Sequence, residues 1–340
     1  MTKLINEKSL NIYYIMVKIK EYVIGTLVTL GAAILYEKYI RHDKKLQELN
    51  NQSLIKQYLL NGDSLDDAKK PILWIHVTHE KNARWWQSFY SRNTEYLNQP
   101  YIFLTIRSII RHCSDSFHIC LIDDESFPTL LPDWKHDVSR LADPIRSHVR
   151  SLALTRVLHT YGGMLVPNSF VCMKDLLPLY NAGLNNTEMF VCENQPDSNV
   201  SDKTYYFPNM SFMGCEKEAD HMKELSNKIS LLIANDSTNQ LDFTGEFNRV
   251  CYNMVLDGKV SVVCGSKIGV KKQDGKPLAI EELMGDSYVD MPNGMCGLYI
   301  PADKILKRTK YQWFARLSVT QALSSSTMLG KYLLICHTGM

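Results

Sequence analysis

Short apolar runs alternate along this chain with segments whose apolar residues recur at helical spacing. The runs 71–77 (PILWIHV) and 117–122 (FHICLI) have the length and the β-branched content of strands. The segments 100–112 and 144–160 have helical spacing, and a third apolar run follows at 164–166. Strands that alternate with helices predict a mostly parallel sheet with right-handed crossovers. The pattern therefore predicts an α/β, Rossmann-like fold, which binds ligands beyond the carboxyl ends of its strands.

The same alternation continues toward the C-terminus. Further strands are expected at 188–193, 210–215 and 259–264. Helices are expected at 217–233, 242–256 and 302–306, and the tail 313–334 also has helical spacing. We therefore expect one α/β domain over residues 71–340.

A charge-free apolar stretch, Tyr22 to Tyr36, precedes this domain and has basic residues on both sides. With its neighbours it predicts a single-pass signal-anchor helix over 22–40, after a short N-terminal segment, 1–21. A membrane span needs about 20 apolar residues, and the charge-free stretch alone is shorter than that. The alternative is a helix that packs on the domain or lies in the membrane–water interface. Similar numbers of basic residues on both flanks leave the side of the membrane open. The polar residues 41–70 are interpreted as a stem or linker.

Charge and cysteine content narrow the class of protein. A net charge of +2, from 38 basic and 36 acidic residues, gives no field that predicts a nucleic-acid partner. The nine cysteines form no C-x-x-C pair and no zinc-site spacing, and their odd number favours a reducing compartment. Five N-x-S/T sequons favour a lumenal domain instead. They lie at Asn51, Asn185, Asn199, Asn209 and Asn235.

The most specific motif lies at the end of the helix predicted at 144–160. Arg146 and Arg150 are four residues apart, so they share the face opposite the apolar stripe. Gly162 and Gly163 follow the helix directly, where glycine permits a left-handed cap and a close approach of backbone. A Gly-Gly cap by itself indicates no particular function.

The wider segment is RSLALTRVLHTYGGMLVPNSFVCMKDLLPLY, residues 150–180. It resembles the L-x-x-Y-G-G-I-Y-x-D-x-D-x…P-L segment of glycosyltransferases with the GT-A fold, such as the relatives of capsular-polysaccharide-synthesis proteins and DxD-containing mannosyltransferases. Weaker likeness extends to residues 71–80, 99–126 and 207–225. The resemblance implies a protein with a nucleotide-sugar-binding fold that transfers a sugar from a nucleotide-sugar to a glycan or protein acceptor.

The metal-binding aspartates of that family are missing here. In those enzymes the Asp pair holds Mn²⁺ or Mg²⁺, which neutralises the diphosphate of the donor. Aligned on the two glycines, the pair falls on Pro167 and Ser169, with Asn168 between them. Proline offers no ligand, and neutral Asn and Ser oxygens bind hard cations weakly. The family's Asp and Arg in the preceding helix fall on Ser151 and Leu154. No metal cofactor is therefore expected, and Mn²⁺ or Mg²⁺ would need an unconventional site.

Two hypotheses follow from this departure. In the first, the chain is a transferase. The diphosphate of its nucleotide-sugar donor is held by Arg146, Arg150 and the backbone N–H groups near Gly162 and Gly163. Asn168 and Ser169 also belong to this donor site. In the second, it is a catalytically inactive scaffold with the same fold, or a structural membrane-associated protein. The sequence leaves open whether the chain is an enzyme.

Polar residues at the predicted strand ends are further donor-site candidates. His76 and Thr78 end the first strand, where such folds contact the base or ribose. Asp123 and Asp124 end the second, where they could bind ribose or replace the missing metal ligands. A surface polar residue and a turn-initiating acidic pair are the structural alternatives.

Asp242 and Glu246 are the candidates for the catalytic base. They stand four residues apart at the start of a predicted helix, a suitable place for a group that activates the acceptor. The alternative is that both carboxylates only stabilise the helix N-terminus.

Overall fold

A computed structural model of the chain describes residues 65, 70–78, 99–194, 207–235 and 245–338. The expected anchor helix, nearly all of the stem and the candidate base Asp242 lie outside these residues. Within the described ranges, no helix combines the length and the apolar character needed to cross a membrane.

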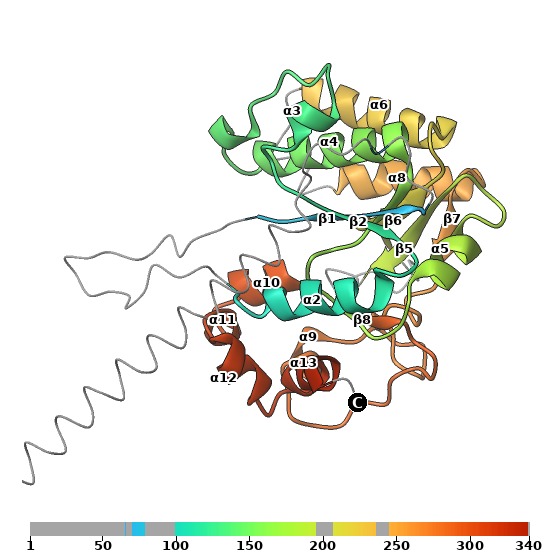
Figure 1. Cartoon of the computed structure of the whole chain (residues 1–340). Helices are drawn as coiled ribbons and strands as arrows, with labels where there is room; N and C mark the ends of the chain where they lie inside the picture. Colours follow the sequence, from blue (N-terminus) through green and yellow to red (C-terminus); the bar gives the residue numbers. More distant parts are fainter. Residues whose placement is uncertain (1–64, 66–69, 79–98, 195–206, 236–244, 339–340) are drawn as a thin grey trace, which may run out of the picture. The chain divides into compact units, whose positions relative to one another are not determined.

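A six-stranded sheet forms the centre of the fold (Figure 1) and has the order β2-β1-β3-β6-β5-β7. β1 pairs in parallel with β2 and β3, and β5 pairs in parallel with β7. β6 is antiparallel to both of its neighbours, β3 and β5, so the other five strands point the same way. The mostly parallel α/β sheet is thereby confirmed. The strands are β1 Ile72–His76, β2 His118–Ile122, β3 Gly163–Leu165, β5 Met189–Asn194, β6 Phe207–Cys215 and β7 Ser261–Val263.

Helices connect these strands and a second, two-stranded sheet. That sheet is antiparallel and pairs β4 (Phe170–Cys172) with β8 (Gly297–Tyr299). The helices are α2 Ile102–Cys113, α3 Phe127–Leu130, the 3-10 helix η2 Val138–Arg140, α4 Ile145–Tyr161, α5 Leu177–Gly183, α6 Asp220–Ala234, α8 Glu246–Leu256, α9 Ile280–Leu283, α10 Ala302–Lys307, α11 Gln312–Ala315, α12 Val319–Leu323 and α13 Met328–Thr338.

One hydrophobic core fills the space between the large sheet and the helices α3, α4, α6 and α8, which lie on the same side of it (Figure 1). Trp74 of β1 is fully buried there, and its indole N–H donates to the Gly162 carbonyl at 2.9 Å. Leu152, Ala153 and Val157 form the predicted apolar stripe of α4 and are buried. Ile145, the first residue of the helix, is also apolar but is exposed.

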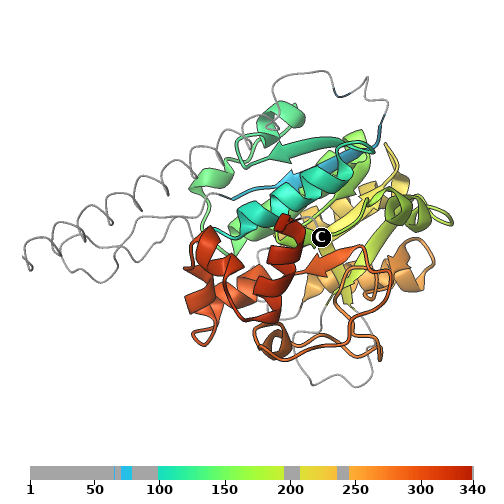
Figure 2. The same cartoon turned by 60° about the horizontal axis from the view of Figure 1, so that its bottom comes forward.

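A second core joins α2, the β4–β8 pair and the C-terminal helices α9 to α13 (Figure 2). Leu104 of α2, Val171 of β4 and Leu298 of β8 meet the buried faces of the C-terminal helices there. The predicted helical tail is three short helices rather than one, because polar turns interrupt it after Ala315 and Leu323.

The Gly162–Gly163 pair has a packing role at the junction of α4 and β3. Gly162 ends the helix at φ 70°, and its N–H donates to Leu158 at 2.7 Å. Gly163 has φ 96°, and a Cβ there would lie 2.2 Å from the Ile72 carbonyl oxygen. Because β3 starts at Gly163, both glycines lie at the amino end of that strand. A side chain at Gly163 would therefore separate β3 from β1.

Candidate functional site

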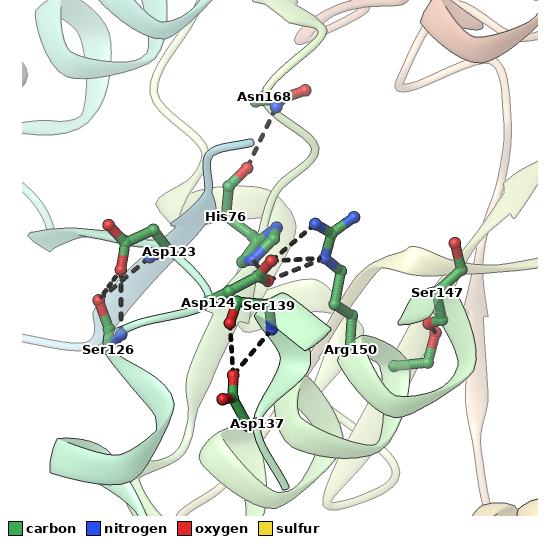
Figure 3. Close-up of polar contacts among 10 residues, drawn as sticks. His76, Asp123, Asp124, Ser126, Asp137, Ser139, Ser147, Arg150 and Asn168 are labelled. Carbon is green, nitrogen blue, oxygen red and sulfur yellow. Dashed lines mark hydrogen bonds and ion pairs between the residues drawn. The ribbon is translucent and has the colours of Figure 1, made fainter. Parts of the chain in front are cut away.

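The carboxyl ends of β1, β2 and β3 bring four of the predicted donor-site residues together. His76 is the last residue of β1 and is in register with Ile122, the last residue of β2. Asp124 follows β2 by two residues, and Asn168 follows β3 by three. Arg150 reaches the same place from the middle of α4 (Figure 3).

Asp124 is the centre of this cluster, and its carboxylate accepts hydrogen bonds from Arg150 and His76. Arg150 binds it through one edge of its guanidinium, with Nε 2.8 Å from Oδ1 and Nη2 2.7 Å from Oδ2. His76 Nε2 lies 3.1 Å from Oδ1. The side chains of His76, Asp124 and Arg150 are only 12%, 22% and 17% exposed. A fork of two parallel hydrogen bonds in a partly desolvated place is the strong form of an Arg–carboxylate pair.

The pKa of Asp124 reports on this arrangement. Partial burial of the carboxylate acts to raise its pKa, but hydrogen bonds from His76 and Arg150 and the charges of both outweigh burial and hold the pKa well below its usual value. The carboxylate is therefore ionised at any physiological pH, and its charge offsets that of Arg150.

His76 is held by contacts on both its ring and its backbone. The ring stacks on Phe127 with centroids 5.6 Å apart and an interplanar angle of 2°. Its carbonyl accepts from Asn168 Nδ2 at 3.1 Å, and Thr105 in turn donates to the Asn168 carbonyl. The loop after β3 is thereby fixed against the end of β1.

Asp123 has a separate, local role. Its Oδ1 accepts from the backbone N–H of Ser126 at 3.0 Å and from the Ser126 hydroxyl at 2.7 Å. This is the turn-initiating geometry that short acidic residues favour. One oxygen of Asp123 therefore stabilises the turn before α3.

Ser169 is placed in the protein interior rather than at the strand ends. It is 4% exposed, and its hydroxyl donates to the Ile300 carbonyl at 2.8 Å, just after β8. Pro167 and Asn168 remain partly exposed beside it. The structure thus separates Ser169 from the other predicted donor-site residues.

Several other predicted residues also lie outside the cluster. Gly162 and Gly163 lie at the amino end of β3, whereas the cluster lies beyond its carboxyl end. Glu246 is in the first turn of α8, where it pairs with Arg249 of the same helix at 3.1 Å. Thr78 follows β1 by two residues and is partly buried.

Arg146 lies one helical turn before Arg150 on α4. Its Nε donates to the Leu141 carbonyl at 2.6 Å, a neutral acceptor. In the described part of the chain it makes no ion pair, so its positive charge is not offset there. Arg146 and Arg150 are equivalent by sequence spacing, but among the described residues only the charge of Arg150 is offset by a neighbouring carboxylate.

Asn209 and Glu193 lie on the same edge of the sheet and were not predicted. β6 begins beyond the end of β3, and Asn209 faces Cys192 where the β5–β6 register is interrupted. Asn209 is 3% exposed, and its Nδ2 has no hydrogen-bond partner among the described residues. Glu193 is also buried and binds Lys271 Nζ at 2.5 Å. Sequence analysis missed Asn209 because its predicted strand began at residue 210.

The described residues offer no conventional metal site. They include no group of three or more His, Cys, Asp or Glu side chains that could hold a metal ion. At the strand ends, Asp124 is committed to Arg150 and His76, and Asp123 to Ser126. The arrangement can instead hold an anionic or polyhydroxylated ligand through charge and hydrogen bonds. No family model matches this chain, and neither a curated protein nor a solved structure matches it significantly.

Proposed function

We propose that this chain is a glycosyltransferase-like protein of the GT-A type that binds a nucleotide-sugar without a metal ion. The observation that carries the proposal is the cluster of His76, Asp124, Arg150 and Asn168 beyond the carboxyl ends of β1, β2 and β3. Ligands of open α/β sheets bind at this edge. The mostly parallel sheet and the resemblance of residues 150–180 support the same assignment.

Arg146 is the better candidate to bind the diphosphate. Its hydrogen-bond acceptor, the Leu141 carbonyl, is neutral, whereas the charge of Arg150 is offset by Asp124. A guanidinium binds phosphate oxygens in a fork and needs no metal bridge. In this proposal Arg150 and Asp124 shape the pocket, and His76 and Asn168 offer polar groups to the nucleoside or the sugar.

A second candidate function is binding without transfer, as an inactive scaffold. It is favoured by the Asp124–Arg150 pair, because an offset cation stabilises the departing diphosphate less well than a free one. As a transferase the chain would act on a glycan or protein acceptor, whereas as a scaffold it would bind a partner protein or a membrane.

The test measures binding before activity. The purified full chain would be titrated with UDP-, GDP- and CMP-sugars, once in the presence of Mn²⁺ and once in the presence of a chelator. Calorimetry measures binding, and thermal shift measures stabilisation. The proposal expects stabilisation by one nucleotide class that is equal under both conditions. Absence of stabilisation by every nucleotide would refute the donor site, and stabilisation only with Mn²⁺ would refute the metal-free mode.

Two variants identify the phosphate-binding cation. Arg146→Ala is expected to weaken nucleotide binding about tenfold, the effect of losing about 1.4 kcal/mol of charge-assisted hydrogen bonding. Arg140→Ala is the matched control, because Arg140 is exposed and pairs with Asp137 at 2.9 Å. Release of nucleoside diphosphate from a bound donor, with an acceptor glycan or protein present, would then separate transfer from binding alone.

A further inference from the structure

Two buried cysteine thiols meet where the end of α2 contacts the end of β4. Cys113 is the last residue of α2 and Cys172 the last residue of β4, and their Sγ atoms are 3.9 Å apart. Both residues are 0% exposed. They are 59 positions apart in the chain, so the contact joins two distant segments.

The structure describes all nine cysteines, and this pair differs from the other seven. Cys120, Cys215 and Cys251 belong to the first core, on the helix-covered face of the large sheet. No thiol–thiol hydrogen bond other than that of Cys113 and Cys172 is found among them. Cys296 is the main competitor, because Cys172 pairs with Gly297, the residue that follows Cys296. The nine cysteines thus include one pair whose thiols are in contact.

The geometry is close to that of a disulfide. A disulfide has sulfurs about 2.05 Å apart, so the two thiols must approach by about 1.9 Å from their 3.9 Å separation. A change of rotamer at the two cysteines can supply a movement of this size. We propose that Cys113 and Cys172 form a disulfide when the chain folds in an oxidising compartment.

The bond forms by exchange with a low-molecular-weight disulfide. One thiolate attacks that disulfide, which gives a mixed disulfide and releases one small thiol. The second protein thiolate then attacks the mixed disulfide, which closes the Cys113–Cys172 bond and releases the second small thiol. The protein dithiol loses two electrons and two protons, and the small disulfide gains them.

Burial sets when this exchange occurs. Burial, and then the hydrogen bond and charge of Cys113, raise the pKa of the Cys172 thiol well above its usual value. A thiol without thiolate character reacts slowly, and both sulfurs are inaccessible in the folded chain. The bond is therefore expected to form during folding and to resist reduction afterwards.

The disulfide would brace the segment that carries Asn168 and Ser169. Ser108 of α2 accepts from the Cys172 backbone N–H at 2.8 Å, and Thr105 of α2 donates to the Asn168 carbonyl. These contacts already hold α2 against the chain from Asn168 to Cys172. A covalent link at their far end completes the same attachment and does not depend on which ligand the site binds.

The experiment compares the full chain produced in two bacterial strains, one with an ordinary reducing cytoplasm and one with an oxidising cytoplasm. Free thiols are blocked with N-ethylmaleimide, and tryptic peptides are analysed without reduction. Cys113 and Cys120 fall in one peptide, 112–135, and Cys172 falls in 157–174. The proposal expects these two peptides to be linked only in the oxidised preparation.

Variants assign the bond. Cys120→Ser removes the ambiguity in peptide 112–135 and should keep the link, whereas Cys113→Ser should abolish it. The oxidised wild type should also melt at a higher temperature than the same sample after reduction in denaturant and refolding. An oxidised preparation without the link, or with Cys172 bound to Cys296 instead, would overturn the proposal.

Discussion

Replacement of Asp124 by asparagine is the sharpest perturbation of the site. The side chain keeps its shape and one acceptor oxygen but loses the charge that Arg150 and His76 share. The variant therefore separates two effects of the carboxylate. It stabilises the fold by pairing with Arg150, and its negative charge opposes the binding of an anion nearby.

The expected loss of stability lies between two limits. Removing one partner of a fully buried ion pair costs about 3–5 kcal/mol, whereas an exposed pair contributes about 0–1 kcal/mol. Asp124 is 22% exposed, and the asparagine still accepts one hydrogen bond, so about 2 kcal/mol is expected. For a domain of this size that corresponds to a fall in Tm of about 3–4 °C.

The loss should depend on pH in a defined direction. The folded pKa of Asp124 lies below the unfolded value of about 3.9, so the unfolded chain takes up the proton first as the pH falls. The wild-type contribution is complete above about pH 5 and declines as the pH falls through 4 toward the folded pKa. The gap between wild type and Asp124→Asn is therefore widest near neutrality and narrows on acidification.

Urea unfolding of both proteins at several pH values, followed by circular dichroism, measures this gap. Asp133→Asn makes the same change at an exposed position and should leave stability nearly unchanged. Nucleoside-diphosphate affinity should rise about tenfold in Asp124→Asn, about 1.4 kcal/mol, because a nearby negative charge has been removed. A pH-independent gap, or a loss of nucleotide affinity, would refute the electrostatic account.

Two further substitutions test the packing around the motif. Gly163→Ala is expected to lose about 3 kcal/mol or more, because its Cβ would meet the Ile72 carbonyl at 2.2 Å and its φ is 96°. Gly258→Ala has a φ of 72° but open space around its Cβ, so it should lose only about 1 kcal/mol in the same urea assay, and equal losses would contradict the clash. Ser169→Asp should destabilise by about 3 kcal/mol, because it buries a carboxylate against the Ile300 carbonyl. Stability restored by Mn²⁺ would show that this position can still bind a metal.

Much of the fold is predictable because its elements are local and strongly patterned. The strands predicted at 71–77 and 117–122 coincide with β1 and β2 within two residues, and the helix predicted at 144–160 coincides with α4 within one. Each is a run of buried or periodic apolar residues that needs no distant partner to be recognised. The direction of β6 was not predictable, because it is set by pairing with β3 and β5 and not by a local pattern.

The candidate site was predictable as a set of residues but not as a set of contacts. Parallel strand ends meet at one edge, so His76, Asp124 and Asn168 were expected together. The pairing of Asp124 with Arg150 spans 26 positions and depends on where α4 crosses the sheet. Sequence spacing made Arg146 and Arg150 equivalent, and only the tertiary contact shows that one of them is offset by a carboxylate.

The position of Ser169 explains why the missing metal motif is more than the loss of two charges. In the glycosyltransferases that residues 150–180 resemble, the corresponding position supplies a metal ligand, but here the Ser169 hydroxyl donates to a backbone carbonyl in the interior. A carboxylate there would meet an acceptor rather than a cation, and burial would penalise its charge. The neighbouring Asn168 uses its amide to hold the end of β1. Asn168 and Ser169 thus belong to the packing between β1, β4 and β8, so under the proposed function ligand binding at this edge rests on the arginines and polar groups around them.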